Sequence, residues 1–63
     1  MVFKVRYQLK GVQVGHPDST RTILEARQLA FEGRTIYGAD FAIILRADRD
    51  GKEAAVESIK LWT

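Results

Sequence analysis

The sequence predicts an α+β fold in which one helix packs on a four-stranded sheet, with the element order ββαββ. Residues 19–32 are the only long segment whose apolar side chains recur at a helical period. The segments on either side of it read as strands, and turn residues at 10–11 and 48–51 divide each of them into a hairpin. We favour a β-grasp arrangement, in which the first and last strands are parallel and central. The alternative is an antiparallel sheet with another strand order.

The first hairpin is predicted from a strand over residues 2–9 that alternates between apolar and polar side chains. The apolar face should cover the helix and carries Phe3, Val5, Tyr7 and Leu9. The other face carries Lys4, Arg6 and Gln8. Gly11 supplies the turn, and residues 12–14 form a short second strand that should end at Gly15 and Pro17.

The helix is expected to follow an N-cap between Asp18 and Thr20 and to end at Gly33, which suits a left-handed C-cap. Thr22 and Glu25 have the spacing of a capping box one turn further in. The apolar arc predicted to face the sheet comprises Ile23, Leu24, Ala26, Leu29, Ala30 and Phe31.

The second hairpin is predicted from residues 41–47, a turn at 48–51 and a fourth strand over residues 53–62. The fourth strand is the harder prediction, because its sequence also has good helix propensity. We prefer a strand, since its end alternates and an Asp-Gly turn precedes it. The alternation breaks in the middle, so we expect a bulge near Glu57 and Ser58.

Length and composition exclude several classes of protein. With 63 residues, the chain is long enough for one domain, residues 1–63, with a small core. It has no cysteine and one histidine, so we expect no disulfide, no closed transition-metal site and no cofactor. The N-terminus does not read as a signal peptide, and the longest apolar run, residues 41–45, is too short to cross a membrane. We therefore expect a soluble, cytoplasmic protein.

No pattern of side chains predicts catalysis. His16 would need a nearby nucleophile and a third, orienting group, and Ser19 and Thr20 are better explained as helix caps. The acidic residues fall in turns, at caps or on the solvent side of the helix. Arg27 falls inside the apolar arc, and we expect it to lie at a sheet edge and to pair with Asp40. We therefore predict that the protein is not an enzyme.

The apolar run at residues 41–45 predicts a contact with another protein. If Phe41, Ile43 and Leu45 face the helix, then Ala42 and Ile44 face away from it, and a strand that is apolar on both faces is usually covered on both. Trp62 shares the outward parity. We therefore predict a protein-interaction module that forms a homodimer through a protein interface of Ala42, Ile44 and Trp62. In the alternative, long side chains shield Ile44 within the monomer.

A second hypothesis is a nucleic-acid contact on a basic sheet face. The net charge of +2 permits such binding without requiring it. The residues predicted to project from this face are Lys4, Arg6, Arg46 and Lys60. Single strands also need exposed aromatic side chains on the same surface, and Trp62 is the one candidate there.

Overall fold

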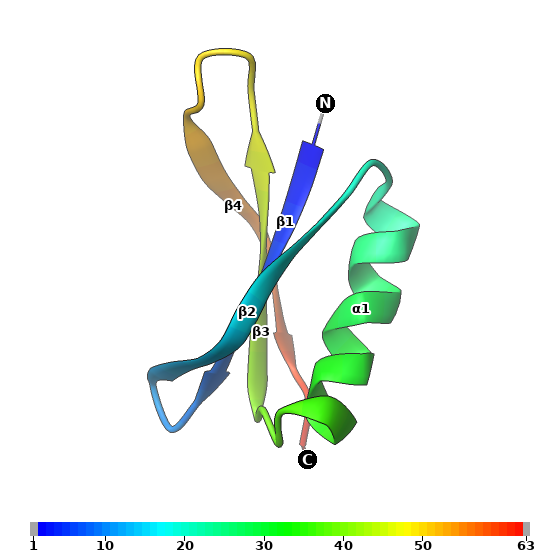
Figure 1. Ribbon diagram of the computed structural model, residues 1–63, viewed down its shortest axis with the longest axis vertical. Helices are drawn as coiled ribbons and strands as arrows, with labels where there is room; N and C mark the ends of the chain where they lie inside the picture. Colours follow the sequence, from blue (N-terminus) through cyan, green and yellow to red (C-terminus); the bar gives the residue numbers. More distant parts are fainter. Residues whose placement is uncertain (1, 63) are drawn as a thin grey trace.

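The computed structural model describes residues 2–62 and confirms the predicted fold class. Five elements follow one another along the chain: β1 (Val2–Leu9), β2 (Val12–Thr20), α1 (Ile23–Ile36), β3 (Phe41–Ala47) and β4 (Glu53–Lys60). The helix covers one face of the sheet (Figure 1). At 14 residues, α1 is too short to cross a membrane, and the described residues contain no other α-helix.

The four strands lie in the order β2-β1-β3-β4, and all neighbours are antiparallel. The antiparallel alternative is therefore correct and the β-grasp arrangement is wrong. The reason is the composition of the strands. β3 is apolar on both faces and takes a central position beside β1, where both of its edges are paired. β4 has an exposed middle and takes the edge.

The edge strand β2 is longer than predicted, because it continues through Gly15 and Pro17 to Thr20. Residues 15–17 lie opposite the single residue Arg6, so the strand contains an irregularity with extra residues. An edge strand tolerates proline, since one side of it has no ladder to complete. Gly15 has a φ of 68°, a left-handed value that glycine adopts readily and other residues rarely do. The ring of Tyr37 packs against Gly15.

The helix begins later than predicted, with Thr22 as its N-cap. The Thr22 hydroxyl oxygen accepts a hydrogen bond of 3.1 Å from the backbone N–H of Glu25. The expected cap range between Asp18 and Thr20 is wrong because both residues belong to β2, where they pair with β1. The capping-box spacing of Thr22 and Glu25, which the sequence placed one turn inside the helix, therefore marks the start of the helix.

The helix also ends later than predicted, because Gly33 lies inside it. The ring of Tyr7 from β1 packs directly on Gly33, where a Cβ atom would overlap the ring. Gly33 is therefore needed for a close approach between helix and sheet. The helix ends at the C-cap residue Tyr37, and Gly38, with a φ of 68°, provides the left-handed position that follows.

The cross-strand register decides which face each residue of β3 occupies. Val5 lies opposite Ile44, and Tyr7 lies opposite Ala42, so these four side chains share the helix-facing side of the sheet. The predicted parity of β3 is therefore wrong. The position opposite Tyr7 must be small, because the Tyr7 ring fills the space between sheet and helix. The side chains that face away from the helix are Phe41, Ile43 and Leu45.

The predicted strand over residues 53–62 is confirmed in type, although β4 ends at Lys60. Ile44 pairs with Glu57 and Leu45 pairs with Ala55, so Val56 is the extra residue of a bulge. The bulge is one residue before the predicted position. The turn before β4 is held by the Asp48 carboxylate, which accepts backbone hydrogen bonds of 3.0 Å from Asp50 and Lys52.

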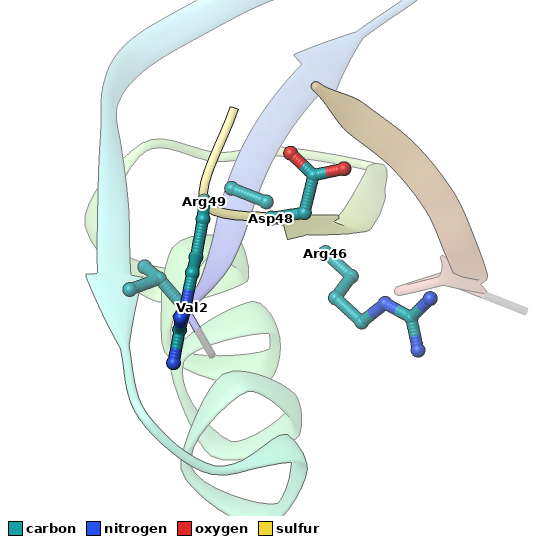
Figure 2. Close-up of a pocket in the computed structure, with 5 residues that line it drawn as sticks. Val2, Arg46, Asp48 and Arg49 are labelled. Carbon is teal, nitrogen blue, oxygen red and sulfur yellow. The ribbon is translucent and has the colours of Figure 1, made fainter. Parts of the chain in front are cut away.

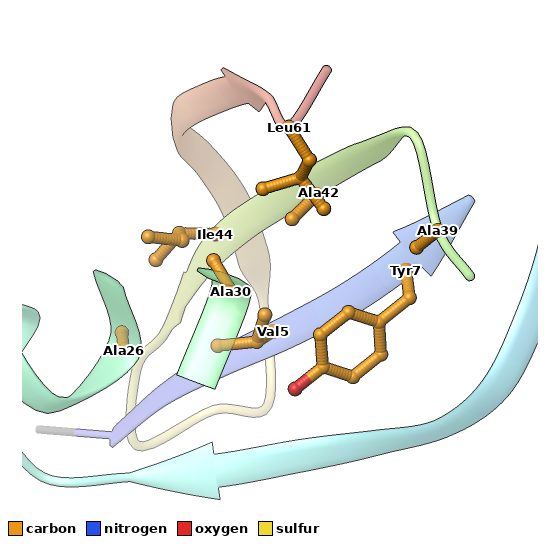
Figure 3. Close-up of a cluster of buried hydrophobic side chains, with 8 residues drawn as sticks. All are labelled: Val5, Tyr7, Ala26, Ala30, Ala39, Ala42, Ile44 and Leu61. Carbon is orange, nitrogen blue, oxygen red and sulfur yellow. The ribbon is translucent and has the colours of Figure 1, made fainter. Parts of the chain in front are cut away.

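The hydrophobic core is thin. Figure 3 shows its eight buried side chains, of which half are alanine: Val5, Tyr7, Ala26, Ala30, Ala39, Ala42, Ile44 and Leu61. α1 faces the sheet with small residues, Ala26, Ala30 and Gly33. The predicted apolar arc is too wide, since Leu24 is 72% exposed and Phe31 is 55% exposed. Leu9 is likewise exposed, at the end of β1.

We predict that Gly33→Ala destabilises the protein, although alanine is the better helix former. The new methyl group would overlap the Tyr7 ring, and such overpacking costs about 1–3 kcal/mol of unfolding free energy. Urea denaturation followed by circular dichroism measures the effect. The control is Thr35→Ala at an exposed helix position, which should leave stability unchanged or slightly raised. Equal stabilisation by both substitutions would show that the ring does not restrict Gly33.

Candidate interaction surfaces

The outer face of the sheet, opposite α1, carries an apolar stripe along the central strand β3. Its three side chains, Phe41, Ile43 and Leu45, are half-buried. Their partial shielding comes from neighbouring side chains of the sheet itself, since the one helix among residues 2–62 packs on the other face. We call Phe41, Ile43 and Leu45 the outer stripe.

Mostly polar side chains border the outer stripe on both sides. On β1, Lys4 lies opposite Leu45, and the remaining neighbours follow the same alternation. The stripe is bordered on β1 by Lys4, Arg6 and Gln8, and on β4 by Glu53, Ala55, Ser58 and Lys60. The surface is therefore apolar along its centre and polar at its rim.

Two of the basic residues on this face are held by one carboxylate. Glu53 Oε2 lies 2.7 Å from Lys4 Nζ, and Glu53 Oε1 lies 2.9 Å from an Arg6 guanidinium nitrogen. The hydrogen bond from Lys4, together with the positive charges of Lys4 and Arg6, lowers the pKa of Glu53 against an opposing effect of desolvation. The sequence did not single out Glu53, because its partners are close to it only across β3.

We predict that Glu53→Gln lowers stability at neutral pH and not at acidic pH. The folded pKa of Glu53 is depressed, so its contribution is present above the ordinary glutamate pKa and is lost as the pH falls through the folded value. The urea midpoint of the variant should be below that of the wild type at pH 7, and the two should converge near about pH 3. A pH-independent difference would mean that the carboxylate charge does not matter.

The structure places the predicted protein-interface residues on the helix side of the sheet. Ala42 and Ile44 are 0% exposed beneath α1, so the prediction that these two side chains face away from the helix is wrong. Trp62 is 45% exposed and follows β4. Its indole N–H donates a 3.0 Å hydrogen bond to the Ala39 carbonyl oxygen, and the guanidinium carbon of Arg34 lies 3.7 Å from its ring centroid.

The predicted basic strip is divided between the two faces. Lys60 lies opposite Phe41 and shares the outer face with Lys4 and Arg6. Arg46 lies opposite Phe3, on the helix-facing side, so it does not join them. Arg46 and Ile44 are two residues apart on β3, so both lie on the helix-facing side and not on the outer face as predicted.

Comparison with protein-family models, curated proteins and solved structures finds no significant match for this chain.

A second exposed surface lies along the flank of α1 that faces β4. Arg27 donates two hydrogen bonds, of 3.0 and 2.9 Å, to the Glu57 carboxylate of β4. The predicted Arg27–Asp40 pair is wrong, because the Asp40 carboxylate lies beyond the other end of the helix and accepts from the Lys10 backbone N–H. Leu24, Arg27, Phe31 and Arg34 follow at intervals of three and four residues and form one row. We call this row, together with Trp62, the helix flank.

The polar groups between β2 and α1 support the fold. The Tyr7 hydroxyl donates a 2.6 Å hydrogen bond to the Asp18 carboxylate, and burial together with this bond raises the Tyr7 pKa well above its ordinary value. The Thr20 hydroxyl donates a 2.7 Å hydrogen bond to Glu25. His16 is exposed on β2. Among residues 2–62, no three His, Cys, Asp or Glu side chains are grouped to hold a metal ion.

A shallow hollow lies at the end of the sheet beside the β3–β4 turn, lined by Val2, Arg46, Ala47, Asp48 and Arg49 (Figure 2). The guanidinium groups of Arg46 and Arg49 point in different directions in this view. The Asp48 carboxylate is turned toward backbone N–H groups of its own turn. The hollow therefore offers no converging pair of charges for an anion.

Proposed function

We propose that this protein is a small non-catalytic protein-interaction module that self-associates through the outer face of its sheet. The observation that carries the proposal is the outer stripe, which occupies three successive outward positions of a central strand and has no covering layer within residues 2–62. The sequence predicted an apolar interface on the outer face of β3. In the structure, that apolar surface is formed by Phe41, Ile43 and Leu45 instead of Ala42 and Ile44. Apolar centre and polar rim are the usual anatomy of a protein interface.

The thin core is a second argument for self-association, because a dimer would bury more apolar surface. Single cores of this size rarely supply more than roughly 3–5 kcal/mol of net stability. Among residues 2–62, the buried apolar side chains are Val5, Tyr7, Ile44, Leu61 and four alanines. Six larger apolar side chains that pack against them are only partly buried. Packing a second copy against the outer stripe would remove further apolar area from water, worth about 25 cal/mol per Å².

The two edges of the sheet are less suited to self-association than its face. β2 contains the irregularity at residues 15–17, and β4 contains the bulge at Val56. Irregularities of this kind twist an edge strand away from regular pairing and protect it against edge-to-edge association. The continuous apolar surface is on the outer face instead.

Charge predicts how this association responds to salt. The outer face carries three basic groups, Lys4, Arg6 and Lys60, and one acidic group, Glu53. Two copies therefore repel each other weakly, and added salt should screen this repulsion and tighten the dimer.

The alternative of a nucleic-acid-binding protein using the basic sheet face has less support. Lys4 and Arg6 already share the Glu53 carboxylate, and Arg46 lies on the opposite face. Phosphate binding at the outer face would also weaken with salt, whereas dimerisation should strengthen.

We predict that Ile43→Lys converts the protein from a dimer to a folded monomer. A buried isoleucine contributes about 1.5–3 kcal/mol, so the dimer dissociation constant should rise at least about tenfold. Light scattering across protein concentration measures the mass, and circular dichroism verifies the fold. The control is Val12→Lys, at an exposed apolar position of the β2 edge, which should leave the mass unchanged.

Three results would contradict the proposal. The wild type could be monomeric at every concentration and salt level tested. Both lysine variants could dissociate equally, which would indicate a general effect of charge. Dissociation of the wild type by added salt would also oppose it, because the outer faces should repel less under those conditions.

A further inference from the structure

The helix flank carries two exposed aromatic side chains, one on α1 and one after β4. Phe31 is 55% exposed and Trp62 is 45% exposed. Arg34 follows Phe31 by about one helical turn, and its guanidinium group lies over the Trp62 ring. In Figure 1 the end of β4, which leads to Trp62, passes beside the last turn of α1.

This flank is open because of where α1 lies on the sheet. The helix packs mainly across β1 and β3, with β2 on one side of it. β4 lies on the other side, where the Arg27–Glu57 pair joins it to the helix. The row from Leu24 to Arg34 is about 15 Å long, at a rise of about 1.5 Å per residue.

Positive charge lies along the helix side of the sheet, with Arg34 beside Trp62 and Arg46 toward the other end of β3. Arg27 and Arg34 belong to the flank, and Arg46 projects from the helix-facing side of β3 next to β4 (Figure 2). Glu57 is the one acidic partner that they engage among residues 2–62, and it pairs with Arg27. Arg34 and Arg46 form no ion pair within residues 2–62.

We propose that the helix flank binds single-stranded nucleic acid, with bases stacking on Phe31 and on the Arg34–Trp62 pair and phosphates contacting the arginines. Aromatic faces and arginine planes accept any base, but only one that is free of a duplex stack. Three arginines against one carboxylate favour a polyanion over a neutral partner. The flank lies on the opposite side of the sheet from the outer stripe, so this inference is independent of the proposed dimer.

Binding is measured with a fluorescein-labelled oligothymidylate of about 15 nucleotides, by anisotropy and by the protein's own fluorescence at low salt. Trp62 is the single tryptophan, so its emission reports on this site alone. We expect micromolar affinity, quenching of Trp62, and a slope of log affinity against log salt near about −2, as three phosphate contacts give.

Two variants test the stacking and the charge. Phe31→Ser should weaken binding about fivefold or more, because one base loses its stacking surface. Arg34→Gln should weaken it further, since it removes both a charge and the group over Trp62. The matched control is Arg21→Gln, which removes the same charge at the other end of the helix and should change affinity less than about twofold. Ile43→Lys, on the outer face, should bind as well as the wild type.

Several outcomes would overturn the proposal. One is the absence of an anisotropy change at low salt; another is binding without quenching of Trp62. Equal losses for Arg21→Gln and Arg34→Gln would indicate non-specific attraction. If Phe31→Ser dissociates a dimer while no oligonucleotide binds, the flank is a protein interface. Failure of the outer-face dimer alone would leave this inference standing, because Ile43→Lys separates the two surfaces.

Discussion

The packing of the Tyr7 ring against Gly33 is the contact on which the rest of the structure depends. Tyr7 reaches from β1 to the helix, where its hydroxyl lies 3.2 Å from the Leu29 carbonyl oxygen. Its ring also lies 4.9 Å from that of Tyr37, centroid to centroid. One aromatic side chain thus fills the space between helix and sheet, and the helix must be small where the ring meets it. This explains the glycine inside α1.

The close approach of α1 has a consequence for the surface. A helix that contacts the sheet through Ala26, Ala30 and Gly33 buries little apolar area of its own, so its larger side chains remain outside. Leu24 and Phe31 are exposed for this reason. The composition of the chain is ordinary for a globular domain, yet much of its apolar surface is available to a partner.

Intramolecular ion pairs divide the basic residues into two groups of different availability. Glu53 holds Lys4 and Arg6 on the outer face, and Glu57 holds Arg27 on the helix side. These exposed pairs contribute little to stability but orient long side chains over apolar neighbours. The outer face is thereby less able to attract phosphate, whereas Arg34 is oriented by an aromatic ring and keeps its charge available.

The sequence by itself determined the ββαββ order, the positions of the tight turns and the presence of one amphipathic helix. These follow from local periodicity and turn chemistry, which neighbouring residues decide. It also indicated that β3 is apolar on both faces. Only the tertiary structure decided which face of β3 is covered, because the parity depends on the register between Val5 and Ile44, which are far apart in the chain. The strand order, the helix end beyond Gly33 and the partners of Glu53 were decided in the same way, through contacts that no local pattern contains.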